Sequence, residues 1–102
     1  MAVQTLNKNN FKEKTKNIAI IKFEASWCTP CKILAPIYED ISNEIKSPFF
    51  KIDVDQEQEL AQQFSIMSVP AIIILKQGQE ILRINGVMPK ETLKNKILSK
   101  IL

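Results

Sequence analysis

The strongest constraint on this chain is a pair of cysteines placed where an apolar strand runs into a helix. Ile18–Phe23 is apolar and rich in β-branched residues, which predicts a buried strand. From Pro30 to Lys46 the apolar side chains recur every three or four residues, which predicts a helix with a proline in its first turn. Cys28 and Cys31 lie at this junction, so the fold must bring both thiols to the start of a helix.

The rest of the chain continues to alternate strands and helices. The other predicted strands are Val3–Leu6, Phe49–Val54, Ala71–Leu75 and Glu80–Asn85. The other predicted helices cover Asn7–Lys16, Gln56–Phe64 with Asp55 as its cap, and the residues after Pro89. The apolar positions of the helix after the cysteines are Ile33, Leu34, Ile37, Ile41 and Ile45. The order β-α-β-α-β-α-β-β-α predicts an α/β fold, a sheet covered by helices and closed by a hairpin.

Composition narrows the classes of function. The 102 residues are 45% hydrophobic, and no linker or repeat divides residues 1–102, so we expect one domain. The net charge of +3 is too weak to predict nucleic-acid binding. There is no histidine, which excludes a histidine base or metal ligand. No apolar run approaches the roughly 20 residues that span a bilayer, so we expect no membrane partner.

Residues 1–17 have no apolar segment of the kind found in secretory signals, so we expect a cytoplasmic protein. In that compartment two cysteines are more often catalytic or metal-binding than structural. The composition, poor in glycine and rich in lysine, isoleucine and asparagine, suggests an AT-rich and therefore bacterial genome.

Thiol–disulfide exchange is the chemistry that this arrangement favours. Cys28 lies where the free N–H groups of the helix point, and the helix dipole lowers the pKa of a thiol there. We therefore expect Cys28 to be the nucleophile. Cys31, one turn further on and more shielded, would attack the mixed disulfide that forms on Cys28. Such exchange needs no metal and no bound cofactor.

Two other interpretations of the cysteines are open. A zinc site normally has four cysteine or histidine ligands, so zinc would need a symmetric dimer or carboxylates here. Two inert core cysteines are the second alternative, because cysteine is often buried. That interpretation leaves the neighbouring Trp27 and Pro30 unexplained.

The segment Trp27-Cys-Thr-Pro-Cys-Lys32 is similar to the thioredoxin family, and the resemblance covers nearly the whole chain. It also rests on Pro36, Lys51–Asp55, Val69–Pro70, Gly78 and Gly86. The resemblance implies the thioredoxin fold, a central mixed sheet of four to five strands flanked by four helices. It implies a monomeric protein-disulfide reductase with a redox-active Cys28–Cys31 disulfide that serves redox homeostasis. Thioredoxin reductase would reset it with electrons from NADPH, which this chain would not bind.

The resemblance also implies roles for residues around the disulfide. Pro70 would be a cis-proline facing the sulfurs, and the backbone at Val69 would pair with a substrate strand. The apolar contact rim would consist of Trp27, Pro30, Met67, Val69, Gly86 and Val87. Ordinary loop packing is an equally simple explanation of Met67 and Val87, and strand-end geometry of Gly86.

Three positions depart from the family. Thr29 stands where glycine is usual and could shift the redox potential in either direction. Lys22 stands where a buried aspartate is usual, and Glu24 where an aromatic residue is common. The family's pair of an acid and a lysine would then be rebuilt as Glu24 with Lys51 or Lys22; otherwise Lys22 reaches solvent and plays no part. A lysine under the thiols would favour the thiolate and make the protein more oxidising.

Two other functions stay open at this stage. One is a docking module that uses the fold as a surface, for which a double Cys→Ser variant would keep its role. The other is an oxidase or isomerase, which a measured reduction potential would identify. The lysines of the last helix are expected to form a solvated face; they are Lys90, Lys94, Lys96 and Lys100.

Overall fold

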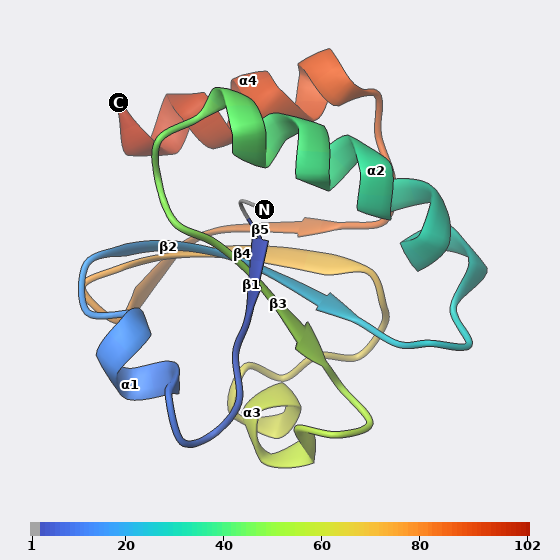
Figure 1. Ribbon diagram of the computed structural model, residues 1–102, viewed down its shortest axis with the longest axis vertical. Helices are drawn as coiled ribbons and strands as arrows, with labels where there is room; N and C mark the ends of the chain where they lie inside the picture. The colour runs from blue at the N-terminus through green and yellow to red at the C-terminus, as the bar shows by residue number, and fades with distance from the viewer. Residues whose placement is uncertain (1–2) are drawn as a thin grey trace.

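A five-stranded mixed sheet is the centre of the molecule in the computed structural model, which describes residues 3–102. Its strands are β1 (Val3–Thr5), β2 (Ile18–Glu24), β3 (Phe49–Asp53), β4 (Ala71–Lys76) and β5 (Gln79–Asn85). They lie in the order β1-β3-β2-β4-β5 (Figure 1). The first three are parallel, whereas β4 and β5 run antiparallel to their neighbours. The mixed sheet and the closing hairpin expected from the sequence are therefore confirmed.

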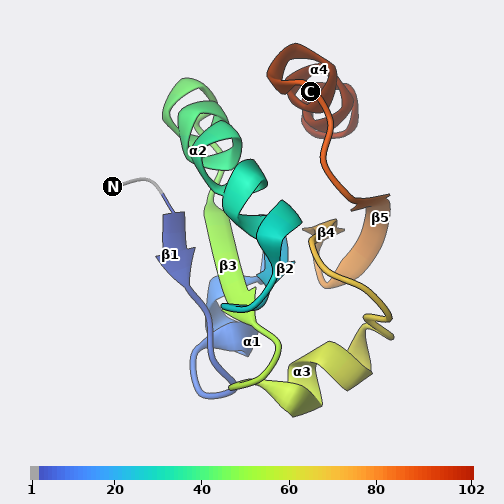
Figure 2. The ribbon, with the colours of Figure 1, turned by 90° about the vertical axis from the view of Figure 1, so that its right-hand side faces the viewer.

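The helices cover both faces of this sheet. Within residues 3–102 they are α1 (Phe11–Lys14), α2 (Thr29–Glu44), α3 (Gln58–Gln63) and α4 (Lys90–Ile101). Figures 1 and 2 show α2 and α4 together on one face, and α1 and α3 on the other. Each face has its own apolar cluster, one built with α2 and α4 and one that includes Leu60 of α3. The order of elements agrees with the order expected from the sequence.

Strand β2 supplies both clusters because its side chains alternate between the two faces. Ile20 packs in the cluster under α2 and α4, whereas Ile21 and Phe23 pack on the opposite face. Lys22 falls on the same face as Ile20, so its side chain is directed toward α2. It is buried there, like the apolar residues around it in the strand. A charged side chain is thus placed inside the larger cluster.

Helix α2 continues through Pro36 and buries a different set of residues from the one expected. Ile33 was predicted to pack inward, but its side chain is 56% exposed. Tyr38, which the sequence pattern omitted, is fully buried between Leu34 and Ile41 along the helix. Since the inward face consists of Leu34, Tyr38 and Ile41 at spacings of four and three, Ile33 lies off it.

Two predicted helix starts were wrong, and side chains explain both. Helix α1 covers only Phe11–Lys14, because the Asn7 side chain accepts N–H bonds from Asn9 and Asn10 and forms a turn first. Asp55 does not cap α3, which begins at Gln58, because the Asp53 side chain accepts the N–H groups of Asp55 and Gln56 and forms a turn there first.

The predicted ends of the remaining elements differ by one or two residues. One example is α2, which ends at Glu44 rather than at Lys46. Along residues 3–102, every helix is too short or too polar to cross a membrane.

Candidate active site

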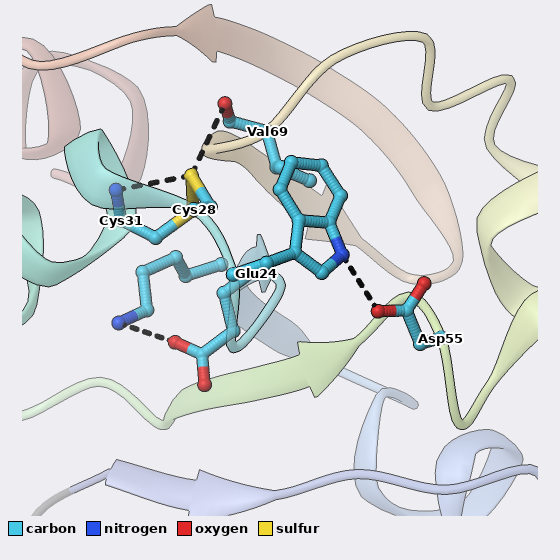
Figure 3. The surroundings of a disulfide bond; sticks show 7 residues. Glu24, Cys28, Cys31, Asp55 and Val69 are labelled. Carbon is cyan, nitrogen blue, oxygen red and sulfur yellow. Dashed lines mark hydrogen bonds and ion pairs between the residues drawn. A yellow bond between two sulfur atoms is a disulfide. The ribbon is translucent and has the colours of Figure 1, made fainter.

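The two cysteines form a disulfide at the start of α2. Cys28 is the N-cap residue, and its Cα lies 5.3 Å from that of Cys31. The backbone N–H of Cys31 donates to Cys28 Sγ at 3.2 Å (Figure 3). A side chain that accepts this N–H satisfies one of the free donors of a helix start. The same contact would stabilise negative charge on Cys28 in the reduced protein.

Both sulfur-bearing residues are almost equally buried, which corrects one expectation. Cys28 is 3% exposed and Cys31 4%, so Cys31 is not the more shielded of the two. The reason is that the loop before β4 covers Cys28 from outside. Thr29 and Pro30, which lie between the cysteines, are exposed instead.

The covering loop contains the Val69–Pro70 bond, which is cis as the resemblance implies. The carbonyl oxygen of Val69 lies 3.6 Å from Cys28 Sγ (Figure 3). Pro70 is buried and leads directly into β4. The backbone at Val69 therefore lies beside the sulfur that is expected to react.

Exposed apolar side chains surround this point. Trp27 is 68% and Met67 93% exposed, and together with Val69 they line a small cavity of about 120 Å³. The indole N–H of Trp27 donates to Asp55 Oδ2 at 2.8 Å, which fixes the ring (Figure 3). Asp55, expected as a helix cap and as part of the segment that resembles the family, thus also holds Trp27 beside the disulfide. No pattern in the sequence links these two residues, because they are 28 positions apart.

Gly86 and Val87 lie after β5, near the same loop. The N–H of Gly86 donates to the carbonyl of Pro70 at 2.9 Å, and its φ of 84° is one that side chains rarely adopt. This strand-end conformation is enough to require glycine. The space where a side chain would be is also open. Val87 is 39% exposed, so it is available for contact.

A buried ion pair lies on the sheet beneath α2. Lys22 Nζ is 2.7 Å from Glu24 Oε1, and the Lys22 side chain is only 4% exposed (Figure 3). The ammonium group also lies 5.0 Å from the centre of the Tyr38 ring, a distance typical of cation–π contact. Lys22 therefore does not reach solvent, although one of the two alternatives for it required that it did.

Of the two pairings considered for Glu24, the structure has the one with Lys22. Lys51 lies beside Lys22 in the register of β2 and β3, but across residues 3–102 it forms no ion pair. Burial raises the pKa of Tyr38 well above its usual value, and the Glu24 carboxylate adds to this. The Tyr38 hydroxyl stays neutral and bonds the carbonyl of Phe50 at 2.7 Å.

Glu24 and Cys31 border the same cavity. This cavity has a volume of about 220 Å³ and opens beside the first turns of α2. Asp53 and Lys32 also line it. Nowhere along residues 3–102 do three cysteine, aspartate or glutamate side chains cluster as metal ligands would.

Comparison with known proteins agrees with this geometry. The family model described as Thioredoxin matches residues 2–99. A thioredoxin of Staphylococcus haemolyticus is 34% identical over 96 residues, which cover 91% of this chain and 92% of that protein. A thioredoxin of Staphylococcus saprophyticus is 33% identical over the same shares of the two chains. These relatives are bacterial, as the composition suggested for this chain.

Solved structures show the same fold. A mutant thioredoxin from Halobacterium salinarum superposes with a TM-score of 0.88 and 26% identity, covering 95% of this chain and 88% of the other. A thioredoxin from Nicotiana alata gives a TM-score of 0.86 and 32% identity over 96% of this chain and 91% of the other. With its disulfide at the start of α2, the chain belongs to the thioredoxin family of thiol–disulfide oxidoreductases.

Proposed function

We propose that this protein is a cytoplasmic protein-disulfide reductase, with residues 1–102 acting as one domain. The observation that carries the proposal is the Cys28–Cys31 disulfide at the start of α2, beside the carbonyl of Val69. A substrate strand that pairs with the backbone at Val69 would bring its own disulfide to Cys28. The rim of Trp27, Met67 and Val87 offers apolar contact without demanding one particular sequence.

The reaction proceeds in two exchanges. The Cys28 thiolate attacks one sulfur of the substrate disulfide, and the other substrate sulfur leaves as a thiolate. Cys31 then attacks Cys28 Sγ, which forms the Cys28–Cys31 disulfide and releases the second substrate thiolate. Two electrons pass from the dithiol to the substrate. Cys28 is the first nucleophile because it accepts the N–H of Cys31 at the helix start.

The oxidised protein must then be reduced again. We propose that a separate thioredoxin reductase, drawing on NADPH, supplies the two electrons. Members of this family need no bound cofactor, so the same exposed rim would serve the reductase and the substrates in turn. We propose that the protein works as a monomer and serves redox homeostasis.

The test uses insulin as the disulfide substrate and dithiothreitol as the electron donor. The wild-type chain should accelerate insulin reduction, and Cys28→Ser should abolish the acceleration. Cys31→Ser, reduced beforehand and freed of dithiothreitol, should stop after the first exchange with insulin and accumulate a mixed disulfide, visible as a mass increase on a non-reducing gel. Activity that survives in Cys28→Ser would contradict the assignment, and so would trapping through Cys31 in that variant.

A further inference from the structure

The proposed exchange leaves one proton without a stated acceptor. Cys31 must lose its proton to attack Cys28, but it is 4% exposed and lies one turn inside α2. Burial raises the pKa of a thiol because it disfavours the charged form. A base within reach would therefore speed the second exchange.

The cavity beside Cys31 contains few groups that can act on this proton. Its ionisable side chains besides Cys31 are Glu24 from β2, Asp53 from β3 and Lys32 from α2. Lys22 and Lys51 lie on the same face of the sheet, and Tyr38 faces them from α2. A lysine ammonium cannot accept a proton and the Tyr38 hydroxyl is neutral, so none of these four groups is a base at neutral pH.

Asp53 is engaged elsewhere. Its Oδ1 accepts the backbone N–H groups of Asp55 and Gln56 at 2.8 and 3.2 Å, which turns that carboxylate toward the loop after β3. Within residues 3–102 the Glu24 side chain makes one polar contact, the ion pair of its Oε1 with Lys22. Its side chain is 25% exposed, so water in the cavity reaches it. Glu24 and Cys31 line the same cavity, and Figure 3 shows the Glu24 carboxylate below the two cysteines.

We propose that Glu24 is the base that takes the proton of Cys31 in the second exchange, through water in this cavity, and that Lys22 positions its carboxylate. This inference rests on the proposed function and assigns a role in it to two residues at which this chain departs from the family's usual pattern. The Cys31 S–H bond breaks, its proton passes to Glu24, and the sulfur attacks Cys28. The protonated Glu24 then returns the proton to the departing substrate thiolate or to water, so the cycle closes without another reactant.

The test separates the two exchanges in one experiment. Reduced full-length protein, in excess, is mixed in a stopped-flow instrument with dithiobis-nitrobenzoate, whose coloured thiolate leaves once in each exchange. The first phase reports attack by Cys28 and the second attack by Cys31. Glu24→Gln should slow the second phase about 10²-fold at neutral pH, as loss of a general base does, without slowing the first phase. Its second phase should then rise with pH into the range in which an unaided, buried thiol ionises, above the ordinary thiol pKa of about 8.5.

Matched variants distinguish this role from a structural one. Glu24→Asp should recover part of the second-phase rate, because the carboxylate is kept. Asp53→Asn keeps an acceptor for the loop amides and should behave as wild type. Since Glu24→Gln leaves Lys22 uncompensated, the double variant Lys22→Met/Glu24→Gln removes the buried charge as well. It should fold and still show the slow second phase.

Two results would overturn the inference. One is a wild-type second phase and pH profile in Glu24→Gln and in the double variant. The other is an equal slowing in Asp53→Asn. A wild-type protein without any first phase would instead defeat the proposed function, and the inference with it. Failure of the inference can therefore be distinguished from failure of the proposed function, because only the second removes the first phase.

Discussion

Two groups of lysine and glutamate side chains bind α2 to the rest of the molecule, and water reaches them differently. Under the first half of the helix, Lys22 and Glu24 form a pair in which the lysine side chain is 4% exposed. At the last residue of the helix, Glu44 pairs with Lys90 and Lys94 of α4 at 2.5 and 2.7 Å. All three of those side chains are about a third exposed. The same chemistry thus occurs once inside the protein and once on its surface.

The exposed group corrects the expectation that the lysines of α4 form only a solvated face. Lys90 and Lys94 join α4 to α2, whereas Lys96 and Lys100 are exposed. Hydrogen bonds from Lys90 and then Lys94 lower the pKa of Glu44 to about 2. They also offset the unfavourable position of a carboxylate at a helix C-terminus. Solvent screens such a group, so a large pKa change need not mean a large gain in stability.

Breaking the buried pair of Lys22 and Glu24 should lower the free energy of unfolding more than any other change to these two groups. Glu24→Gln leaves the Lys22 ammonium buried without its partner, which should cost about 3 kcal/mol of unfolding free energy. Lys22→Met should cost less, because the remaining carboxylate reaches the cavity and water. The measurement is urea unfolding followed by the fluorescence of Trp27.

A double variant sharpens this prediction. Lys22→Met with Glu24→Leu removes both charges and should recover most of the loss, as apolar replacements of buried pairs often do. Losses that simply add in the double variant would contradict the interpretation that the two side chains depend on each other.

Tyr38 extends the buried group and should give the next largest effect. Tyr38→Phe keeps the ring under Lys22 but removes the hydroxyl bonded to Phe50, which should cost about 1–2 kcal/mol. Because the folded pKa of Tyr38 is raised, its neutral form adds stability below its ordinary pKa of about 10. That contribution is lost as pH rises through the folded pKa.

The direction of the Tyr38 pKa shift can be measured directly, because Tyr38 is the chain's one tyrosine. Its ultraviolet absorbance should show ionisation well above pH 10, coincident with unfolding. Ionisation near its ordinary pKa in a folded protein would show that Tyr38 is not buried as described. Tyr38→Phe should lack the alkaline loss of stability that this ionisation causes.

The reduction potential should respond to the buried group and ignore the exposed one. Glu24→Gln leaves an uncompensated ammonium that favours thiolate, so the potential should rise, by about 30 mV if the thiolate gains tenfold. Lys22→Met and Lys22→Asp should lower it, which is the test of the expectation that Lys22 makes the pair more oxidising. Glu44→Gln should leave it unchanged. Equilibration with glutathione gives all four values, and shifts of one sign throughout would contradict the charge argument.

Breaking the exposed group should give the smallest effect, and one that depends on pH and salt. The lowered pKa of Glu44 means that its contribution is present above pH 4.5 and is lost as pH falls toward about 2. Urea unfolding of wild type and Glu44→Gln should therefore differ slightly at neutral pH and converge near pH 2. Molar salt should also remove the difference. A difference that is larger at pH 2 would have the wrong sign.

Local patterns predicted the fold well where one pattern repeats over a long element. The apolar run of β4 and the spacing along α2 gave both elements to within two residues. The pattern erred at Ile33, because an apolar residue at a suitable spacing can still lie beside the buried stripe. It also missed short-range side-chain bonds, such as those of Asn7, which replaced the first turns of α1.

The residues of the candidate site also fall into those that local sequence motifs predict and those that they miss. Cys28, Cys31 and the Val69–Pro70 bond follow from motifs that are contiguous in the chain. The contact of Trp27 with Asp55 depends on how two loops meet, so no spacing could show it. The pairing of Glu24 with Lys22 rather than Lys51 was open because both lysines share one face of the sheet. In the structure, the Lys22 ammonium that pairs with Glu24 also packs against the Tyr38 ring. The sequence pattern did not place Tyr38 in the core.

The most direct test of the central claim, that the Cys28–Cys31 pair reduces protein disulfides, is its equilibrium reduction potential. The wild-type protein is equilibrated with glutathione buffers and followed by Trp27 fluorescence, because Trp27 adjoins the pair. We predict a value above the roughly −270 mV of thioredoxin, because Lys22 favours the thiolate, but still below about −200 mV, within the range of cytosolic reductants. A value near −120 mV, that of a strong oxidant, would contradict the assignment as a reductase and mean that Thr29 or Lys22 has turned the site toward oxidation.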